Sequence, residues 1–248
     1  MKQKMNKPKG IIHEYHFGYP SPIADTVLFI KRDTRLDEYK RHLSDVVEFG
    51  KVWHGITGAL SGTEVTIIVT GIGPSLVGDA VYALDKPGAL CLYSGTCGGI
   101  DVDFQIGDYV LARQAICADG YSFLYGHNPL THLEANSEAL EALHSSLSTC
   151  VHAPKEGTVI TTSSVVREND SDFWELIGPS GQAIDMGCAS FYAAALHSQK
   201  RAAAYFWVTD LPTRGKSFYD SFSTPELAMK QQRYAQTVSV DMQILANL

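Results

Sequence analysis

The stretch at residues 65–84 reads V-T-I-I-V-T-G-I-G-P-S-L-V-G-D-A-V-Y-A-L, and it decides the fold class. Its first five residues are apolar or β-branched, a composition typical of a buried strand. Two glycines and a proline then form a turn at residues 70–74, and residues 77–84 follow with helical spacing of apolar side chains. A buried strand, a tight turn and a helix in this order indicate an α/β fold.

The same alternation continues along the chain in both directions. Further strands are predicted at residues 25–30, 89–93, 109–112, 158–160 and 203–208, and helices at residues 36–47, 186–196 and 226–248. Short apolar strands that alternate with helices predict a layered fold whose sheet is largely buried on both faces. Ligands of such folds bind at the carboxyl ends of strands. Three segments that we expect to be loops have that position, at residues 70–74, 94–99 and 209–214.

Composition and charge favour one cytoplasmic domain. The chain has 248 residues, of which 45% are hydrophobic, and this is enough for one large core. Its net charge of −7 offers no basic surface for a nucleic acid. The basic N-terminus is not followed by the apolar segment of a signal peptide, and no apolar run is long enough to span a membrane. We expect a flexible tail at residues 1–12 and a single domain at residues 13–248.

The cysteines and histidines do not suggest a metal site. Five cysteines occur at irregular spacing without a C-x-x-C pair, which favours free thiols in a reducing compartment. The nine histidines include no pair at the spacing of a zinc site. We therefore expect neither a metal nor an organic cofactor.

Several short motifs occur in a fixed order from about residue 13 to the C-terminus. They are H-F-G at 16–18, D-T-V-L-F-I-K-R-D-T-R at 25–35, T-G-I-G-P-S at 70–75, S-G-T-C-G-G at 94–99, I-G-D-Y-V at 106–110, D-G-Y-S at 119–122, D-M at 185–186 and V-T-D at 208–210. In order and spacing this set resembles the nucleoside phosphorylase family, which includes uridine phosphorylase, hexameric purine nucleoside phosphorylase and methylthioadenosine nucleosidase. The resemblance implies three α/β/α layers around a twisted mixed sheet, as in phosphorylase/hydrolase-like folds.

The resemblance also implies a reaction and an assembly. The expected reaction is cleavage of the N-glycosidic bond of a nucleoside, with a purine favoured and with phosphate or water as the acceptor. The expected assembly is a homodimer or a hexamer of dimers, in which a neighbouring subunit completes each site. Neither a nucleic acid nor a membrane is expected as a partner.

Asp210 is the predicted catalytic residue. A purine leaves more easily when its N7 is protonated, and a carboxylic acid can donate that proton if burial raises its pKa. Asp210 follows the apolar run A-A-Y-F-W-V, so a desolvated position is expected. A turn or N-cap aspartate is the structural alternative, because Pro212 lies two residues further on.

The resemblance assigns further residues to the site. Met186 is expected under the ribose, and His16 is expected to reach the ribose 5′ end of a neighbouring subunit. Structural alternatives remain for each, since a methionine can serve the core and a histidine can lie on the surface. The predicted substrate-binding residues are His16, Thr96, Gly95, Met186, Asp185 and Phe173, and the predicted phosphate-binding residues are Arg35, Gly73 and Thr96.

Three residues depart from the family pattern. Tyr93 and Val47 stand where phosphorylases of the family have arginines that bind phosphate, and charge-assisted contacts of this kind contribute about 1.5–3 kcal/mol each. Gly187 stands where the family has a glutamate that accepts hydrogen bonds from the ribose hydroxyls. The glycine is compatible with an altered sugar, an acceptor from Asp185 or Glu168, lost activity, an engineered change or close helix packing. A protein that binds nucleosides or nucleotides without catalysis is therefore the alternative hypothesis.

Overall fold

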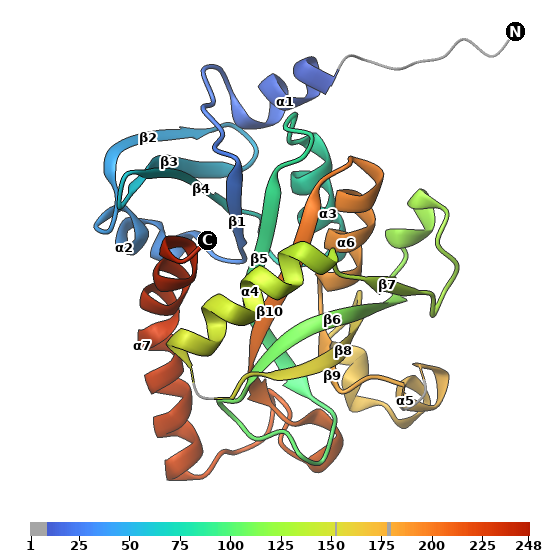
Figure 1. The fold of residues 1–248 in the computed structure, drawn as a ribbon. Helices are drawn as coiled ribbons and strands as arrows, with labels where there is room; N and C mark the ends of the chain where they lie inside the picture. Colours follow the sequence, from blue (N-terminus) through green and yellow to red (C-terminus); the bar gives the residue numbers. More distant parts are fainter. Residues whose placement is uncertain (1–8, 152, 178–179) are drawn as a thin grey trace, which may run out of the picture.

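The computed structural model describes residues 9–151, 153–177 and 180–248, which form a mixed sheet between two layers of helices (Figure 1). The strands are β1 (Thr26–Ile30), β2 (Ser44–Gly50), β3 (His54–Leu60), β4 (Thr63–Val69), β5 (Leu90–Gly99), β6 (Tyr109–Ala118), β7 (His132–Glu134), β8 (Lys155–Thr162), β9 (Ala183–Asp185) and β10 (Arg201–Asp210). The helices are α1 (Lys9–Phe17), α2 (Leu36–Lys40), α3 (Pro74–Ala83), α4 (Ser137–Cys150), α5 (Ser171–Ile177), α6 (Cys188–His197) and α7 (Thr224–Ala246).

The sheet is partly closed on itself. Its ten strands follow the order β10-β6-β8-β9-β5-β1-β4-β3-β2, with β7 paired to β6. Because β10 pairs with β5 as well as with β6, the strands β10, β6, β8, β9 and β5 form a ring. Parallel pairs such as β1–β5 and antiparallel pairs such as β3–β4 occur together. The predicted twisted mixed sheet is confirmed, and its central strands β5 and β1 carry most of the candidate site.

Two hydrophobic clusters define the layers. One cluster lies under α3 and α6 and includes Val81 and Phe191. The other lies under α2, α4 and α7 and includes Leu143 and Ile244. Both faces of the central strands are therefore covered, which explains why those strands are almost uniformly apolar in sequence.

Two element predictions were wrong. The helix predicted at residues 36–47 ends at Lys40, and residues 44–50 form the edge strand β2. The segment at residues 94–99 is not a loop, because β5 continues through its glycines to Gly99. These glycines serve close packing, since a Cβ at Gly98 would lie 3.0 Å from Ile184 and one at Gly99 3.0 Å from Leu211. Tertiary contacts therefore decide the conformation of both segments.

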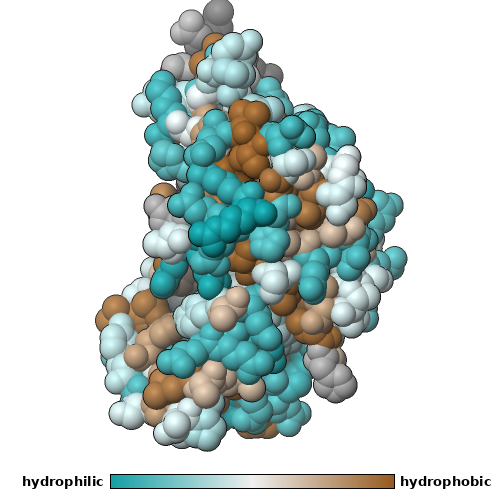
Figure 2. Space-filling model, turned by 90° about the vertical axis from the view of Figure 1, so that its left-hand side faces the viewer, coloured by the Kyte–Doolittle hydropathy of each residue, from teal (hydrophilic) through white to brown (hydrophobic). Residues whose placement is uncertain are grey.

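Helical structure begins closer to the N-terminus than the sequence predicted. Helix α1 begins at Lys9, so residues 9–12, which we assigned to a flexible tail, are helical, and residues 1–8 lie outside the described part. Among the described helices, none combines the length and apolar character that crossing a membrane requires. The face that carries α2, α7 and β2 is largely hydrophilic, with separate apolar patches among the polar side chains (Figure 2).

Candidate active site

Two adjoining cavities open at the carboxyl ends of β1 and β5. The first lies between these strands and α7, and its lining includes Arg35, Ser94, Gly95 and Asp241. The second extends toward β9 and α5, and its lining includes Gly98, Glu168, Asp185 and Met186. Both cavities are lined by Lys31, Arg32, Ile72, Thr96 and Tyr234. The two cavities therefore meet at the end of β1.

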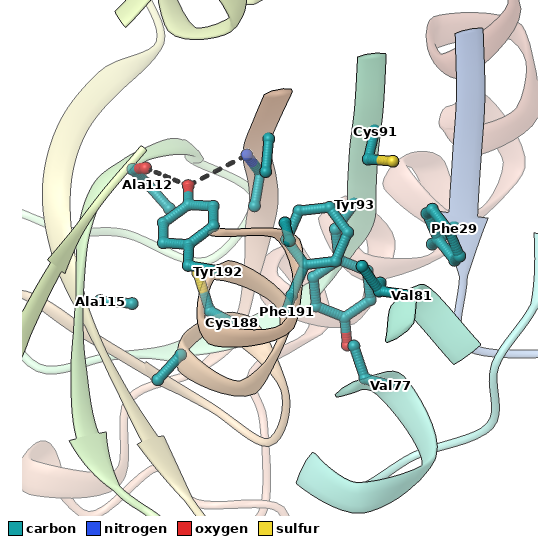
Figure 3. Close-up of a cluster of buried hydrophobic side chains, with 14 of the residues drawn as sticks. Phe29, Val77, Val81, Cys91, Tyr93, Ala112, Ala115, Cys188, Phe191 and Tyr192 are labelled. Carbon is teal, nitrogen blue, oxygen red and sulfur yellow. Dashed lines mark hydrogen bonds between the residues drawn. The ribbon is translucent and has the colours of Figure 1, made fainter. Parts of the chain in front are cut away.

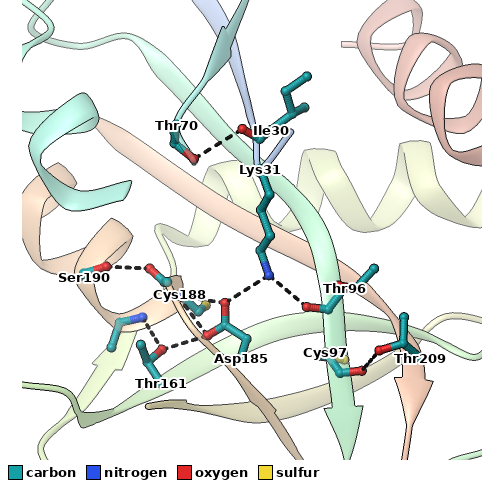
Figure 4. A network of polar contacts seen from close by, with 12 residues as sticks. Ile30, Lys31, Thr70, Thr96, Cys97, Thr161, Asp185, Cys188, Ser190 and Thr209 are labelled. Atoms are coloured by element: carbon teal, nitrogen blue, oxygen red, sulfur yellow. Dashed lines mark hydrogen bonds and ion pairs between the residues drawn. The ribbon is translucent and has the colours of Figure 1, made fainter. Parts of the chain in front are cut away.

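Lys31 lies at this junction, directly after the last residue of β1. Its Nζ donates a hydrogen bond of 2.9 Å to the carbonyl oxygen of Thr96 and lies 3.7 Å from Oδ2 of Asp185 (Figure 4). The same Nζ lies 5.5 Å from the ring centre of Tyr93 and 5.2 Å from that of Phe206. A carbonyl, a carboxylate and two aromatic rings thus compensate for burial of the ammonium.

Asp185 is positioned by its neighbours and faces Lys31. Its Oδ1 accepts hydrogen bonds from Oγ1 of Thr161 at 2.9 Å and from the backbone N–H of Cys188 at 3.0 Å. The side chain of Asp185 is fully buried. These contacts orient its carboxylate toward Lys31, and because Asp185 also lines the second cavity, its contact with substrate stays a prediction. Met186, the next residue, lines the second cavity, and its position under the ribose stays a prediction.

Asp210 ends β10 beside the second cavity. In the sheet it is paired with Gly98, which lines that cavity. Its Oδ1 accepts a hydrogen bond of 2.7 Å from Thr209, whereas its Oδ2 is buried without a hydrogen-bond partner among the described residues. Burial raises the pKa of Asp210 to about 6. A buried carboxyl with one free oxygen can hold a proton and donate it to a base.

Glu168 is a second buried carboxyl on the same cavity. It belongs to a short 3-10 helix at Val166–Asn169, and the indole Nε1 of Trp174 donates to its carbonyl oxygen at 2.9 Å. Burial, followed by the negative charges of Asp210 and Asp185, raises the pKa of Glu168 to about 8. Such an environment favours a protonated Glu168 at neutral pH, able to donate a hydrogen bond into the cavity.

Tyr93 and Gly187 depart from the family pattern as one unit. The Tyr93 side chain is fully buried between β5 and α6, and its ring stacks on Phe191 with 5.3 Å between the ring centres (Figure 3). A Cβ at Gly187 would lie 2.5 Å from the Tyr93 hydroxyl oxygen and 3.0 Å from Cγ2 of Val77. No side chain fits at residue 187 while Tyr93 has this position. Of the explanations considered for Gly187, close packing therefore has direct structural support.

The floor of the first cavity is a buried polar cluster. The carboxylate of Asp241 on α7 accepts hydrogen bonds from the hydroxyls of Ser94, at 2.9 Å, and of Tyr39 and Tyr205. Burial raises the pKa of Asp241 to about 6. This cluster joins α2, β5, β10 and α7 and thereby fixes the position of the cavity wall that α7 supplies.

The remaining predicted residues divide into two groups. Gly95, Thr96 and Arg35 line the first cavity, and Arg35 donates there to the carbonyl oxygen of Tyr234. Gly73, before α3, follows Ile72, which lines both cavities, but it lines neither itself.

Phe173 and His16 do not reach the cavities of the same chain. Phe173 packs in a hydrophobic cluster with Ile116 and Ile184 and lines neither cavity, so its predicted contact with substrate has no support from this geometry and stays a prediction. The ring of His16 packs against that of Trp53, with 4.7 Å between the ring centres and a tilt of 38°, and its helix α1 lies at the opposite end of the molecule from α5 (Figure 1). Its expected contribution to a neighbouring subunit remains a prediction.

Sequence reasoning missed Lys31. Its position directly after a predicted strand was a usable signal, since ligand contacts gather at the carboxyl ends of strands. Val47 is half-exposed on β2, far along the sheet order from β5. Within the described residues, no group of three or more His, Cys, Asp and Glu side chains could hold a metal ion.

The sequence of the chain is similar to those of known proteins. The model of the phosphorylase superfamily matches residues 27–238. A guanosine phosphorylase of Halorubrum lacusprofundi is 27% identical over 175 residues, which are 65% of this chain and 67% of that protein.

Solved structures show the same fold at lower identity. A uridine phosphorylase of Vibrio fischeri superposes with a TM-score of 0.69 at 17% identity and covers 91% of this chain and 93% of its own. A 5′-methylthioadenosine/S-adenosylhomocysteine nucleosidase of Neisseria meningitidis superposes with a TM-score of 0.71 at 16% identity. The match covers 90% of this chain and 100% of that protein. An AMP nucleosidase of Bacteroides thetaiotaomicron superposes with a TM-score of 0.69 at 22% identity. The match covers 96% of this chain and 98% of that protein.

Proposed function

Since the chain belongs to the phosphorylase superfamily, we propose that it cleaves the N-glycosidic bond of a purine nucleoside or nucleotide, with Asp210 as the proton donor. One observation carries this proposal. Oδ2 of Asp210 is buried beside the second cavity without a partner among the described residues, and the pKa of this carboxyl is raised to about 6. The purine-type name of the relative from Halorubrum lacusprofundi supports the choice of base.

The proposed reaction separates charge in a defined way. As the bond between C1′ and N9 breaks, its electron pair goes to the base, and Asp210 donates a proton to N7. The sugar develops oxocarbenium character and is captured at C1′ by phosphate or by water. Buried donors that act where charge develops commonly accelerate such steps by about 10²–10⁴-fold. Asp210 regains its proton from solvent when the base leaves.

The neighbouring groups are consistent with a purine in the second cavity. Glu168 offers a donor or an acceptor to the edge of the base, depending on its protonation. Met186 offers an apolar surface to the sugar. Because Gly187 supplies no side chain, the sugar hydroxyls would have to be bound by other groups of the cavity.

The decisive experiment measures release of the free base. Inosine, guanosine, adenosine, methylthioadenosine, AMP and uridine are incubated with the protein, with phosphate and without it, and the products are separated by chromatography. We expect release from purine substrates; dependence on phosphate would identify a phosphorylase, and independence a nucleosidase. Absence of release from every substrate would contradict the proposal and would favour a protein that binds without catalysis.

The variant Asp210→Asn tests the assigned proton donor. We expect kcat to fall by about 10²–10⁴-fold with substrate affinity nearly unchanged, because the amide keeps the shape but cannot protonate N7. In the wild type, kcat/KM should fall as the pH rises through about 6, where Asp210 loses its proton. Asp103→Asn, on an exposed loop, is the control. A variant Asp210→Asn with full activity would exclude Asp210 as the donor.

A further inference from the structure

The ammonium of Lys31 is only partly used by the protein. An ammonium carries three N–H donors. Among the described residues, Nζ of Lys31 makes one hydrogen bond, to the carbonyl oxygen of Thr96, and the 3.7 Å separation from Asp185 is an ion pair beyond hydrogen-bond length. The side chain is only 13% exposed. Donors that remain free in so buried a group are costly unless a ligand uses them.

The slot that holds Lys31 is built by neighbouring residues. Its stem passes over Gly95, where a Cβ would lie 2.6 Å from Cε of Lys31. Tyr93 and Phe206 place the faces of their rings beside Nζ. The fully buried carboxylate of Asp185 accepts hydrogen bonds from Thr161 and the backbone of Cys188, and it places a negative charge beside Nζ of Lys31. The position of the ammonium is therefore defined before any ligand binds, as a preorganised binding group requires.

Among the side chains that the structure describes, those lining the first cavity are more often cationic than anionic. Lys31, Arg32 and Arg35 line it, and Thr96 and Ser94 belong to the same lining. The carboxylate of Asp241, which belongs to the same lining, accepts hydrogen bonds from two tyrosines and Ser94. Cationic forks, an ammonium and hydroxyls together suit a tetrahedral oxyanion.

The position of Tyr93 explains why the cation of this site comes from Lys31, directly after β1, and not from β5. Tyr93 is directed into the core under α6, and Gly187 provides the space for its hydroxyl, so β5 offers no cation at this position. Lys31 lies over the ring of Tyr93 and brings a cation to the edge of the same strand.

We infer that Lys31 is a substrate-binding residue that holds an oxygen of a phosphate group where the two cavities meet, with Asp185 as its positioning residue. This inference rests on the proposed function, because it assigns the phosphate to the same reaction site. Two sources share this chemistry: inorganic phosphate as the acceptor, or the phosphate of a nucleoside monophosphate. In both, Lys31 donates hydrogen bonds to a non-bridging oxygen of the phosphate group.

Equilibrium binding tests this inference without turnover. Inorganic phosphate and AMP are titrated separately by calorimetry into Asp210→Asn protein in a chloride buffer, so that no product forms. We expect Lys31→Met to weaken binding by about 10- to 100-fold, the loss of one charge-assisted contact, and Lys31→Arg to recover part of it. Lys86→Met removes an exposed lysine paired with Asp25 and is the matched control.

A second variant distinguishes loss of binding from loss of folding. Lys31→Met leaves the Asp185 carboxylate buried without its cation, which can destabilise the fold. The double variant Lys31→Met/Asp185→Asn removes both charges and keeps an acceptor for Thr161 and Cys188. We expect it to fold, as measured by its thermal unfolding, and to bind phosphate as weakly as the single variant. In the otherwise wild-type protein, Asp185→Asn should raise KM for the phosphate-bearing reactant more than it lowers kcat.

The outcomes separate the two proposals. Weakened binding of inorganic phosphate identifies the acceptor as the ligand of Lys31, whereas weakened binding of AMP alone identifies a nucleotide. Wild-type affinity for both ligands in the folded double variant overturns the role of Lys31. So does failure of Asp210→Asn protein to bind either ligand, even if the wild type still releases base from nucleosides, in which case the proposed function stands alone.

Discussion

The hydroxyl of Tyr93 and the absent side chain at Gly187 depend on each other. The hydroxyl is buried without a hydrogen-bond partner among the described residues, and a Cβ at residue 187 would lie 2.5 Å from it. Gly187 has a φ of −165°, an extended conformation that other residues also adopt. Space, not backbone conformation, therefore requires the glycine.

A double-mutant cycle measures this dependence. We expect Gly187→Ala to reduce the free energy of unfolding by about 1–3 kcal/mol, because the new methyl group overpacks the site. In a Tyr93→Phe background the same change should cost less, and Tyr93→Phe alone should be neutral or stabilising because it removes an unsatisfied hydroxyl. Urea unfolding of the four proteins gives the coupling. Additive effects would contradict the direct contact.

Glu168 makes stability depend on pH. Its pKa is 4.5 in an unperturbed chain and about 8 here, so the folded state binds the proton more tightly than the unfolded state. Stability from this group is therefore greatest below about pH 4.5 and is lost progressively as the pH rises to about 8.

The variant Glu168→Gln should remove this loss. Relative to the wild type, its free energy of unfolding is expected to rise by about 4–5 kcal/mol between acidic and alkaline pH, because the pKa shift from 4.5 to about 8 corresponds to about 1.4 kcal/mol for each pKa unit. Urea unfolding at about pH 4.5 and pH 8.5 measures the difference, with the exposed Glu175→Gln as the control. If the free energies of unfolding of Glu168→Gln and the wild type differed by the same amount at both pH values, the pKa of the Glu168 carboxyl would not be raised by folding.

Among the elements, β5 and α7 contribute most to the first cavity. Strand β5 supplies Ser94, Gly95 and Thr96 while it pairs with β1 on one side and β10 on the other. Helix α7 supplies Tyr234 from its middle and Asp241 from its second half. The first turn of α7 lies outside the cavity lining, so its stability can be changed without altering the site.

The capping box at the start of α7 tests this separation. The hydroxyl of Ser223 donates to Oε2 of Glu226 at 2.7 Å, and the backbone N–H of Ser223 donates to the same oxygen at 2.8 Å. Ser223→Ala should lower the free energy of unfolding by about 1 kcal/mol and leave kcat unchanged. Ser239→Ala, at an exposed position within the helix, should be neutral or slightly stabilising. Loss of activity in Ser223→Ala without loss of stability would contradict this assignment.

For the whole molecule, the shared active site is the main prediction. His16 lies on α1 and lines neither cavity of its own chain, and the resemblance assigns it to the site of a neighbouring subunit. Asp210 lies beside the second cavity of its own chain, where we propose that it donates the proton. A hybrid of His16→Ala and Asp210→Asn subunits would therefore contain one site with both side chains intact.

Subunit mixing measures this directly. His16→Ala and Asp210→Asn proteins, each with low activity, are unfolded, mixed in equal amounts and refolded together. Random assembly of dimers should restore about one quarter of the wild-type activity, because half the dimers are hybrids with one intact site. Each variant refolded alone is the control. No gain above these controls would place His16 outside the shared site.

The sequence determined the fold class and the order of the main strands along the chain, and it predicted a site at their carboxyl ends, where the two cavities open. These follow from local information: apolar runs of strand length, the turn after residues 65–69, and ordered motifs that end at Asp210. Tertiary structure decided what depends on contacts between distant residues. It drew residues 94–99 into a strand between β1 and β10, assigned Phe173 to the core, joined Tyr93 to Gly187 and brought Lys31 between Thr96 and Asp185. Such pairings join residues far apart in the chain, and no local periodicity encodes which side chains will share a cavity.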